Sequence, residues 1–252
     1  MPQVPGGGKG GSSGVQSVGA GGGGGSALVP GPDISESYRQ VPVKYLQGSQ
    51  GDIDGIEPLA RAIVDSGMNV RPIIVEQNDF QNFTVLKGNK EYQAGLRARE
   101  IDPKIGEFSN VIIVNESNKK AILEQSRILD TVNRLDKQVV LPNKNGSTYM
   151  SGYKATSEMD HYQIPVRYLG DTPKLSAKEE KIADRLARSI VQSGGMIQPI
   201  LVTQNNMQSY HPLGGRIQIA AIEKAKKLSP KTIEMVRVVI VPPDKINAAT
   251  RQ

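Results

Sequence analysis

Two short glycine-containing stretches have the residue types that hold phosphate. Each joins glycine to a cationic side chain and is followed by residues that could form a helix. Backbone N–H groups at a helix start, glycines that allow close approach and a nearby cation together suit phosphate oxygens. One interpretation is a phosphate site at each stretch, formed by Gly88 and Lys90 in the first and by Gly214, Gly215 and Arg216 in the second. The alternative is that the second stretch is only a tight turn with a surface arginine.

Other kinds of reactive centre find little support. The chain has no cysteine, which removes disulfides, thiolate catalysis and cysteine metal ligands. Its two histidines, His161 and His211, lie too far apart in the sequence to form a zinc motif. The acidic pair Glu179–Glu180 is expected in a loop, and an isolated pair does not make the converging metal site of a nuclease. We therefore predict neither catalytic residues nor metal ligands.

Basic residues gather near the ends of two expected helices. The net charge is +6, a balance that permits binding to DNA or another polyanion. Aromatic residues make up only 4% of the chain, which disfavours base-stacking platforms. The side chains that could contact a nucleic-acid backbone are Arg97, Arg99, Lys224, Lys226, Lys227 and Lys231. The alternative is that they are solvated cations, favoured at helix C-termini by the helix dipole.

The N-terminal segment is rich in glycine and serine and has little apolar bulk. Such a segment cannot bury enough surface to offset its ordering entropy, so residues 1–35 are expected to form a flexible tail. It lacks the apolar core of a signal peptide. No apolar run approaches the roughly 18 residues of a membrane span. These features predict a soluble, cytoplasmic protein, located in the host cytoplasm or the virion if the chain is viral.

The rest of the chain contains an internal repeat. LARAIVDSGMNVRPIIVEQN at 59–78 matches LARSIVQSGGMIQPILVTQN at 186–205, with an offset of 127 residues. The offset holds without a gap over 56 positions, of which 23 are identical. Earlier, VPVKYL at 41–46 matches IPVRYL at 164–169 with an offset of 123. Two structural units of roughly 80 residues are the natural interpretation.

Each unit has the same predicted order of elements. A short strand at 41–46 or 164–169 precedes an amphipathic helix, which ends at Gly67 or Gly194 in a left-handed cap. Two strands, the glycine turn with its helix, and a closing strand follow. This order predicts an α/β (α+β) protein built of small mixed-sheet units. The expected domains are the tail at 1–35, unit one with a following amphipathic helix at 36–137, a linker at 138–160, and unit two at 161–252.

Apolar residues that recur in both copies on the predicted inner faces should form the core. They are Ile63, Ile73, Val75 and Ile113 in unit one and Ile190, Ile200, Val202 and Ile240 in unit two. The helix expected at 117–137 carries its own apolar side, formed by Ile122, Leu129, Val132 and Leu135.

The motifs resemble those of the N-terminal domain of the ParB/sulfiredoxin superfamily. SIVQSGGMIQPILV at 189–202 is similar to the family's helix end and Gln-Pro-Ile strand, and AIVDSGMNVRPIIV at 62–75 matches it less closely. GNKEYQAG at 88–95 and GRIQIAAI at 215–222 fall where the family has its Gly-x-x-Arg-x-x-Ala turn and helix. The resemblance implies two degenerate tandem copies of this domain. It also implies CTP or ATP as ligand at the glycine turns, and DNA as a partner.

Both copies depart from the family pattern at the motif arginine, where Glu91 and Gln218 stand. A carboxylate that faces phosphate is repulsive. DTVNR at 130–134 lies where the family has Glu-Asn-x-Gln-Arg, so the resemblance adds Asn133 and Arg134 to the candidate nucleotide contacts. The sulfiredoxin cysteine is absent, and the segment between the units has no room for the helix-turn-helix of ParB.

Three functions remain open. The first is a non-catalytic tandem ParB-like protein that binds DNA or nucleotide and acts through assembly, in a partition-like or accessory role. The second is a structural protein of a viral or plasmid-encoded particle, which uses the fold as a packing unit and has itself or other assembly proteins as partners. The third is a nuclease or ATP-dependent kinase of the superfamily, which the loss of the motif arginine disfavours.

Overall fold

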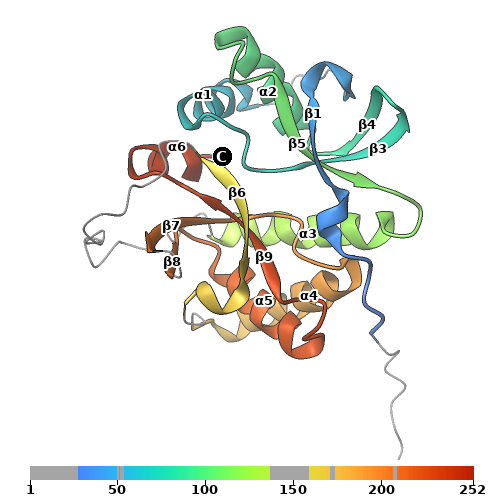
Figure 1. Ribbon diagram of the computed structural model, residues 1–252, viewed down its shortest axis with the longest axis vertical. Coiled ribbons are helices and arrows are strands. Elements are labelled where there is room, and N and C mark those ends of the chain that lie inside the picture. Colours follow the sequence, from blue (N-terminus) through green and yellow to red (C-terminus); the bar gives the residue numbers. More distant parts are fainter. Residues whose placement is uncertain (1–27, 50, 52–53, 137–158, 171–173, 207–208) are drawn as a thin grey trace, which may run out of the picture.

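Two mixed sheets, each covered by helices, make up the protein (Figure 1). The computed structural model describes residues 28–49, 51, 54–136, 159–170, 174–206 and 209–252. Most of the expected tail and of the expected linker lies outside these residues. No helix in this part of the chain is long and apolar enough to cross a membrane. The predicted mixed α/β class is confirmed.

The first sheet has five strands in the order β1-β5-β3-β4-β2. Its inner strands β3 and β5 are parallel, with Ile73 opposite Val111, and β1 and β4 flank them in antiparallel orientation. The short β2 pairs with β4 in parallel. The strands span Tyr38–Pro42 (β1), Leu46–Gln47 (β2), Ile73–Asp79 (β3), Asn82–Lys87 (β4) and Phe108–Val114 (β5). β-Branched residues fill both faces of β3 and β5, as expected for strands covered on both sides.

The second sheet repeats this order, with β6-β9-β7-β8 in the places of β1-β5-β3-β4. Ile200 of β7 lies opposite Val238 of the parallel β9, as Ile73 lies opposite Val111. The strands span Asp160–Pro165 (β6), Ile200–Asn206 (β7), Ser209–Pro212 (β8) and Met235–Ile240 (β9). The gapless offset in the sequence therefore corresponds to the same strand pairing in both sheets.

The described residues form six α-helices and four short 3-10 turns. The helices are α1 (Ile56–Ser66), α2 (Asn89–Ile101), α3 (Lys119–Asp136), α4 (Ala177–Ser193), α5 (Arg216–Leu228) and α6 (Ile246–Thr250). The 3-10 turns are Ile34–Ser37, Val43–Tyr45, Val166–Tyr168 and Pro243–Lys245. Gly67 and Gly194 follow α1 and α4 with φ of 90° and 77°, which confirms the predicted left-handed caps.

The expected strands at 41–46 and 164–169 are wrong in their second halves. β1 ends at Pro42 and β6 at Pro165, and a 3-10 turn follows each of them. Proline has no N–H to continue a strand ladder. The turn buries the next valine in each unit, which explains why the sequence pattern stays apolar there.

The acidic pair Glu179–Glu180 lies in a helix, not in the loop that we expected. α4 begins at Ala177, and Ser176 and Glu179 form a capping box at its start. Because of this cap, α4 has 17 residues where its counterpart α1 has 11. α4 is thus six residues longer than α1 at its N-terminal end, two more than the four-residue insertion that the offsets indicate.

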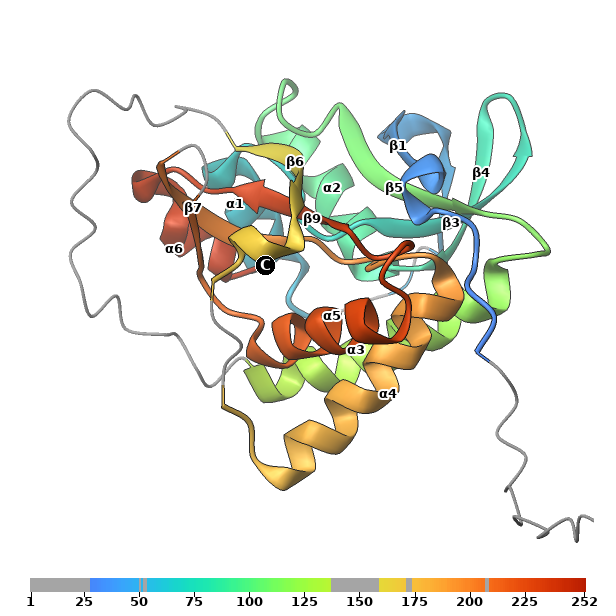
Figure 2. The same cartoon turned by 60° about the horizontal axis from the view of Figure 1, so that its bottom comes forward.

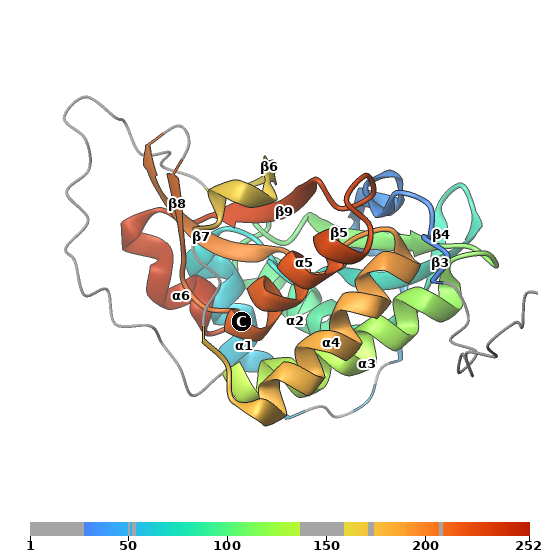
Figure 3. The same cartoon turned by 90° about the horizontal axis from the view of Figure 1, so that it is seen from below.

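Helix α3 joins the two units. Its buried Ile122, Leu129 and Val132 belong to a core that also contains residues of α4, α5 and β5, and Leu135 packs against that core partly buried. Figures 2 and 3 show α3 lying alongside α4. Helix α6 takes the corresponding place on the other side, against α1. The largest core therefore spans both units, and the expected domain boundaries stay a prediction.

Two buried glutamines hold α3 against unit two and α6 against unit one. Gln125, next to the middle of α3, donates hydrogen bonds to Ser193 Oγ (2.6 Å) and the Gly195 carbonyl (2.9 Å) and accepts one from the Ile197 N–H (2.7 Å). All three partners lie just at or after the end of α4. Each unit's closing segment makes this contact in the other unit.

Gln252, which follows α6, makes the equivalent bonds in unit one. It donates to Ser66 Oγ (2.7 Å) and the Met68 carbonyl (3.0 Å) and accepts from the Val70 N–H (2.9 Å). Each of its partners stands 127 residues before the corresponding partner of Gln125, the offset of the repeat. The two units are therefore related by an approximate twofold arrangement at this contact.

The first strands of the units also meet the opposite unit. The Tyr38 hydroxyl of β1 donates to the Ile197 carbonyl, and its ring lies 3.9 Å from the Arg237 guanidinium carbon. His161 of β6 lies 2.9 Å from the Asn110 side-chain nitrogen through its Nε2. Burial and, secondarily, Arg237 lower the pKa of His161 to about 4, so this ring is neutral in the folded protein at neutral pH.

Seven of the eight predicted core residues are buried, the most exposed of them Ile240 at 6%. The exception is Ile113, which is only partly buried. Its neighbour Ile112 is fully buried against α3 instead, because that helix covers the second face of the sheet. The prediction for Ile113 is therefore wrong.

Candidate phosphate-binding pockets

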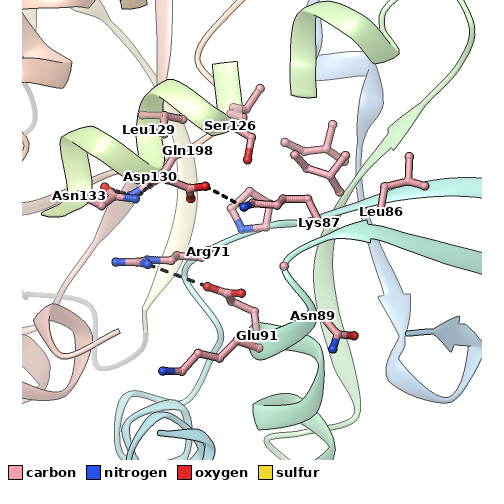
Figure 4. Close-up of a pocket in the computed structure, with 16 residues that line it drawn as sticks. Arg71, Leu86, Lys87, Asn89, Glu91, Ser126, Leu129, Asp130, Asn133 and Gln198 are labelled. Carbon is pink, nitrogen blue, oxygen red and sulfur yellow. Dashed lines mark hydrogen bonds and ion pairs between the residues drawn. The ribbon is translucent and has the colours of Figure 1, made fainter. Parts of the chain in front are cut away.

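The first glycine turn opens into a cavity of about 350 Å³, which we call pocket one. The turn and the start of α2 form one wall, α3 forms another, and Gln198 of unit two closes a third (Figure 4). The volume lies in the range of small-molecule sites, roughly 300–1,000 Å³. Of the predicted contacts, pocket one brings together Gly88, Lys90 and Asn133.

Glycine is required at this turn. Gly88 precedes α2 with a φ of 91°, in the left-handed region that L-residues rarely adopt. A Cβ at this position would lie 3.3 Å from the Ile73 Cα. A glycine also has no side chain to cap the helix, so the first N–H groups of α2 remain open to a ligand.

The charged groups of pocket one are partly paired. Lys87 lies 2.7 Å from Asp130 of α3, and Arg71 lies 3.9 Å from Glu91 (Figure 4). Lys90 forms no ion pair with any residue that the structure describes. Three cations against two carboxylates leave the lining with one net positive charge.

The second glycine turn opens into a cavity of about 160 Å³, which we call pocket two. Gly214, Gly215 and Gln218 line it from unit two, and Asp136 lines it from the end of α3. It adjoins pocket one, because Arg71, Asn133 and Gln198 line both cavities. Arg71 and Gln198 are themselves equivalent residues in the repeat.

Arg216, the cation predicted to serve this turn, points elsewhere. Its guanidinium lies 2.8 Å from Glu179 and donates to the Lys174 carbonyl at 3.4 Å. Hydrogen bonds from Ser176 hold the pKa of Glu179 below its usual value, so Arg216 faces a full carboxylate. The structure therefore does not place Arg216 with Gly214 and Gly215 around pocket two.

The motif helix of unit one contributes Asn133 but not Arg134. Asn133 and Gln198 exchange hydrogen bonds of 3.0 and 3.3 Å between the two pockets. The exposed Arg134 donates to the Asp130 carbonyl of its own helix at 3.1 Å. It lines neither pocket.

The six basic residues near the ends of α2 and α5 differ in whether they form ion pairs. Arg97 pairs with Glu57 at 2.8 Å, and the equivalent Lys224 pairs with Asp184 at 2.6 Å, so both hold two helices of a unit together. The other four cations, Arg99, Lys226, Lys227 and Lys231, form no ion pair within the described part of the chain. Arg99, Lys227 and Lys231 are exposed.

Sequence reasoning missed three pocket residues, Arg71, Asp136 and Gln198. Arg71 and Gln198 stand directly before the Pro-Ile strand starts, at positions that the repeat aligns. That these two residues line the same cavities could not be seen without knowing that α3 packs against unit two. Asp136 reaches the second turn only because α3 crosses to unit two.

Comparisons with known proteins give weak similarities. No protein-family model matches the chain, and no curated protein sequence is significantly similar to it. One similar structure is a C-terminally truncated chromosome-partitioning protein ParB from Caulobacter crescentus complexed with CTP-gamma-S. It is 14% identical, covers 42% of this chain and 63% of its own, and has a TM-score of 0.27.

Two further structures give the same score. ParB from Caulobacter crescentus complexed to the centromeric parS site is 25% identical over 39% of this chain and 49% of its own, with a TM-score of 0.27. A free serine kinase in complex with AMP is 9% identical over 90% of this chain and 86% of its own, also at 0.27. The chain thus spans about half to two thirds of the ParB structures. These scores are too low to transfer fold or function, so the arguments below rest on contacts within this chain.

Proposed function

We propose that the chain binds a phosphate-bearing small ligand of nucleotide size in pocket one. The observation that supports this most is the combination at one cavity of an uncapped helix start, a glycine with positive φ and a net positive lining. The N–H groups of α2 would bind phosphate oxygens, and the ammonium of Lys90, which lies beside Gly55 in the unliganded structure, would turn toward them. The amides of Asn133 and Gln198 would offer further polar contacts on the opposite wall.

The geometry favours a small ligand over duplex DNA. Pocket one is a cavity between three elements, whereas a nucleic-acid backbone needs an open row of cations. Two of the six basic residues predicted for such a row, Arg97 and Lys224, already pair with carboxylates. CTP and ATP are the ligands to test first, because they are those implied by the family that the motifs resemble.

Binding would act through the contact between the units. Gln198 belongs to unit two and Gly88 to unit one, so a ligand in pocket one would touch both. Occupancy would stabilise one relative placement of the units, and we propose that this placement is the one that acts in assembly. Among the described residues, no group of three His, Cys, Asp or Glu could hold a metal ion.

The test is a titration of the full chain with CTP and ATP by calorimetry. Lys90→Ala should weaken binding about ten-fold or more, since a charge-assisted bond contributes roughly 1.5–3 kcal/mol. Glu91→Gln should tighten it, because a repelling carboxylate is removed. Lys226→Ala, at the far end of α5, is the matched control and should bind like wild type.

Duplex DNA at two salt concentrations completes the experiment. Steeply salt-dependent DNA binding that survives Lys90→Ala, with no nucleotide binding, would replace the proposal by backbone recognition. Absence of both kinds of binding would leave the structural role in first place.

A further inference from the structure

The second glycine turn already holds an anion, and that anion belongs to the chain. Asp136, at the end of α3, lines the same cavity as Gly214 and Gly215, which directly precede α5. α5 has 13 residues and begins after Gly215, whose φ is 77° and which offers no side-chain cap. A carboxylate therefore lies where the helix dipole and open N–H groups favour negative charge.

This internal contact is incomplete. Asp136 Oδ2 is buried and has no hydrogen-bond partner among the residues that the structure describes. Burial raises the pKa of the Asp136 carboxyl to about 6, although Arg216 and the Ile217 N–H favour its charged form. Glu179 of α4 opposes ionisation, and Arg71 also faces the cavity. The surroundings of Asp136 thus disfavour the ionised form of its carboxyl group.

A second group in pocket two lacks a partner as well. Gln218 is 5% exposed and lines the cavity, and its Nε2 is buried without a hydrogen-bond acceptor in the described structure. Buried amide donors are normally paired, so an unpaired one that lines a cavity indicates a missing acceptor. An oxyanion with several oxygens could accept from Gln218 and from the α5 N–H groups together.

We propose that Asp136 acts as an internal occupant that closes the second glycine turn to phosphate. Pocket two is then an autoinhibited oxyanion site, which opens when the carboxylate is removed, neutralised or displaced. The consequence is a chain with two equivalent turns of which one is open. The inference concerns a different cavity from pocket one and does not need nucleotide to bind there.

The test compares Asp136→Ala, Asp136→Asn and wild type in titrations with inorganic phosphate and with sulfate. Backbone amide shifts of Arg216 to Gln218 locate the bound anion by NMR. Asp136→Ala should bind phosphate about ten-fold more tightly than wild type, because the carboxylate that occupies the cavity and repels an anion is gone. Asp244→Ala removes an exposed carboxylate elsewhere and should change nothing.

Two further arms separate this inference from the proposed function. The double variant Lys90→Ala with Asp136→Ala should keep the gained phosphate binding, because pocket one is not involved. Sulfate keeps its charge between about pH 5 and pH 8, so tighter sulfate binding by wild type at about pH 5 reports on Asp136. Asp136→Asn should remove that pH dependence.

Phosphate affinity of both Asp136 variants within two-fold of wild type would overturn the inference, whatever pocket one binds. So would amide shifts confined to the first glycine turn. Phosphate binding gained by Asp136→Ala in a chain that binds no nucleotide would support the inference and contradict the proposed function.

Discussion

Gln125→Ala is expected to loosen the contact between the units at one identified amide. The wild-type side chain is fully buried and makes three hydrogen bonds to the segment after α4. The Ser193 hydroxyl can still donate to the Ser189 or the Gly195 carbonyl after the substitution. The Ile197 N–H, in contrast, loses the one partner that the structure shows for it.

The cost follows from this inventory. A lost neutral hydrogen bond destabilises by roughly 0.5–1.5 kcal/mol, and a buried donor left unpaired costs about 1–3 kcal/mol. With a small cavity added, Gln125→Ala should lower the free energy of unfolding by about 3–4 kcal/mol. Gln252→Ala should act at the Val70 N–H in the same way, and somewhat less, because Gln252 is 8% exposed and water can reach the vacated space.

Denaturant unfolding combined with hydrogen exchange checks the reasoning. In Gln125→Ala the Ile197 amide should exchange faster while the Val70 amide keeps its protection, and Gln252→Ala should show the reverse. The matched control is Gln192→Ala, an exposed glutamine on α4. If the Ile197 amide exchanges at the wild-type rate in Gln125→Ala, the glutamine does not hold the units as described.

Three further substitutions test the electrostatics and the core. Asp136→Asn should stabilise the protein by about 1–2 kcal/mol at neutral pH after allowance for solvent screening. Burial raises the pKa of Asp136 to about 6. The stability of wild type relative to this variant should therefore fall as the pH rises from about 4 to about 7. A difference in melting temperature that does not depend on pH would contradict this assignment. For His161→Gln the stability difference should change with pH in the opposite direction, because the pKa of His161 is lowered to about 4. Wild type should lose about 2–3 kcal/mol of unfolding free energy relative to the variant as the pH falls from about 6.5 to about 4. Urea unfolding at several pH values measures this difference. Ile200→Ala should cost about 2–5 kcal/mol, and the partly buried Ile113→Ala less; equal costs would mean that burial does not decide the difference.

The sequence predicted those features that depend on neighbours along the chain. Apolar periodicity and the Ser-Gly helix ends placed α1, α4 and the parallel strands correctly, because the same local rules act twice. The repeat also held an unused signal: the gapless offset, carried past Val114, aligns Gln125 with Gln252. That alignment marks the residues that join the units.

The contents of the pockets were not predictable in this way. Arg216 turns to Glu179 because the capping box extends α4 toward it, and no pattern around Arg216 itself shows this. Asp136 lines the cavity at the second turn because α3 crosses to unit two, although it stands about 80 positions before that turn in the sequence. Such placements depend on how helices pack, which residue spacing alone does not determine.

The reciprocal glutamine contact has a consequence for how the two halves can diverge. In a homodimer one codon change alters both sides of the twofold axis, so a substitution that improves one copy of a site must be tolerated in the other. Here one codon change alters one side, because both halves are encoded once in the same chain. The Lys87-Gly88 turn and the Gly214-Gly215 turn differ in charge while the glutamines that hold their units remain equivalent. The tether also keeps the halves together at any protein dilution. The molecule can therefore carry unequal sites in a fixed one-to-one ratio, which a symmetric pair of identical chains cannot.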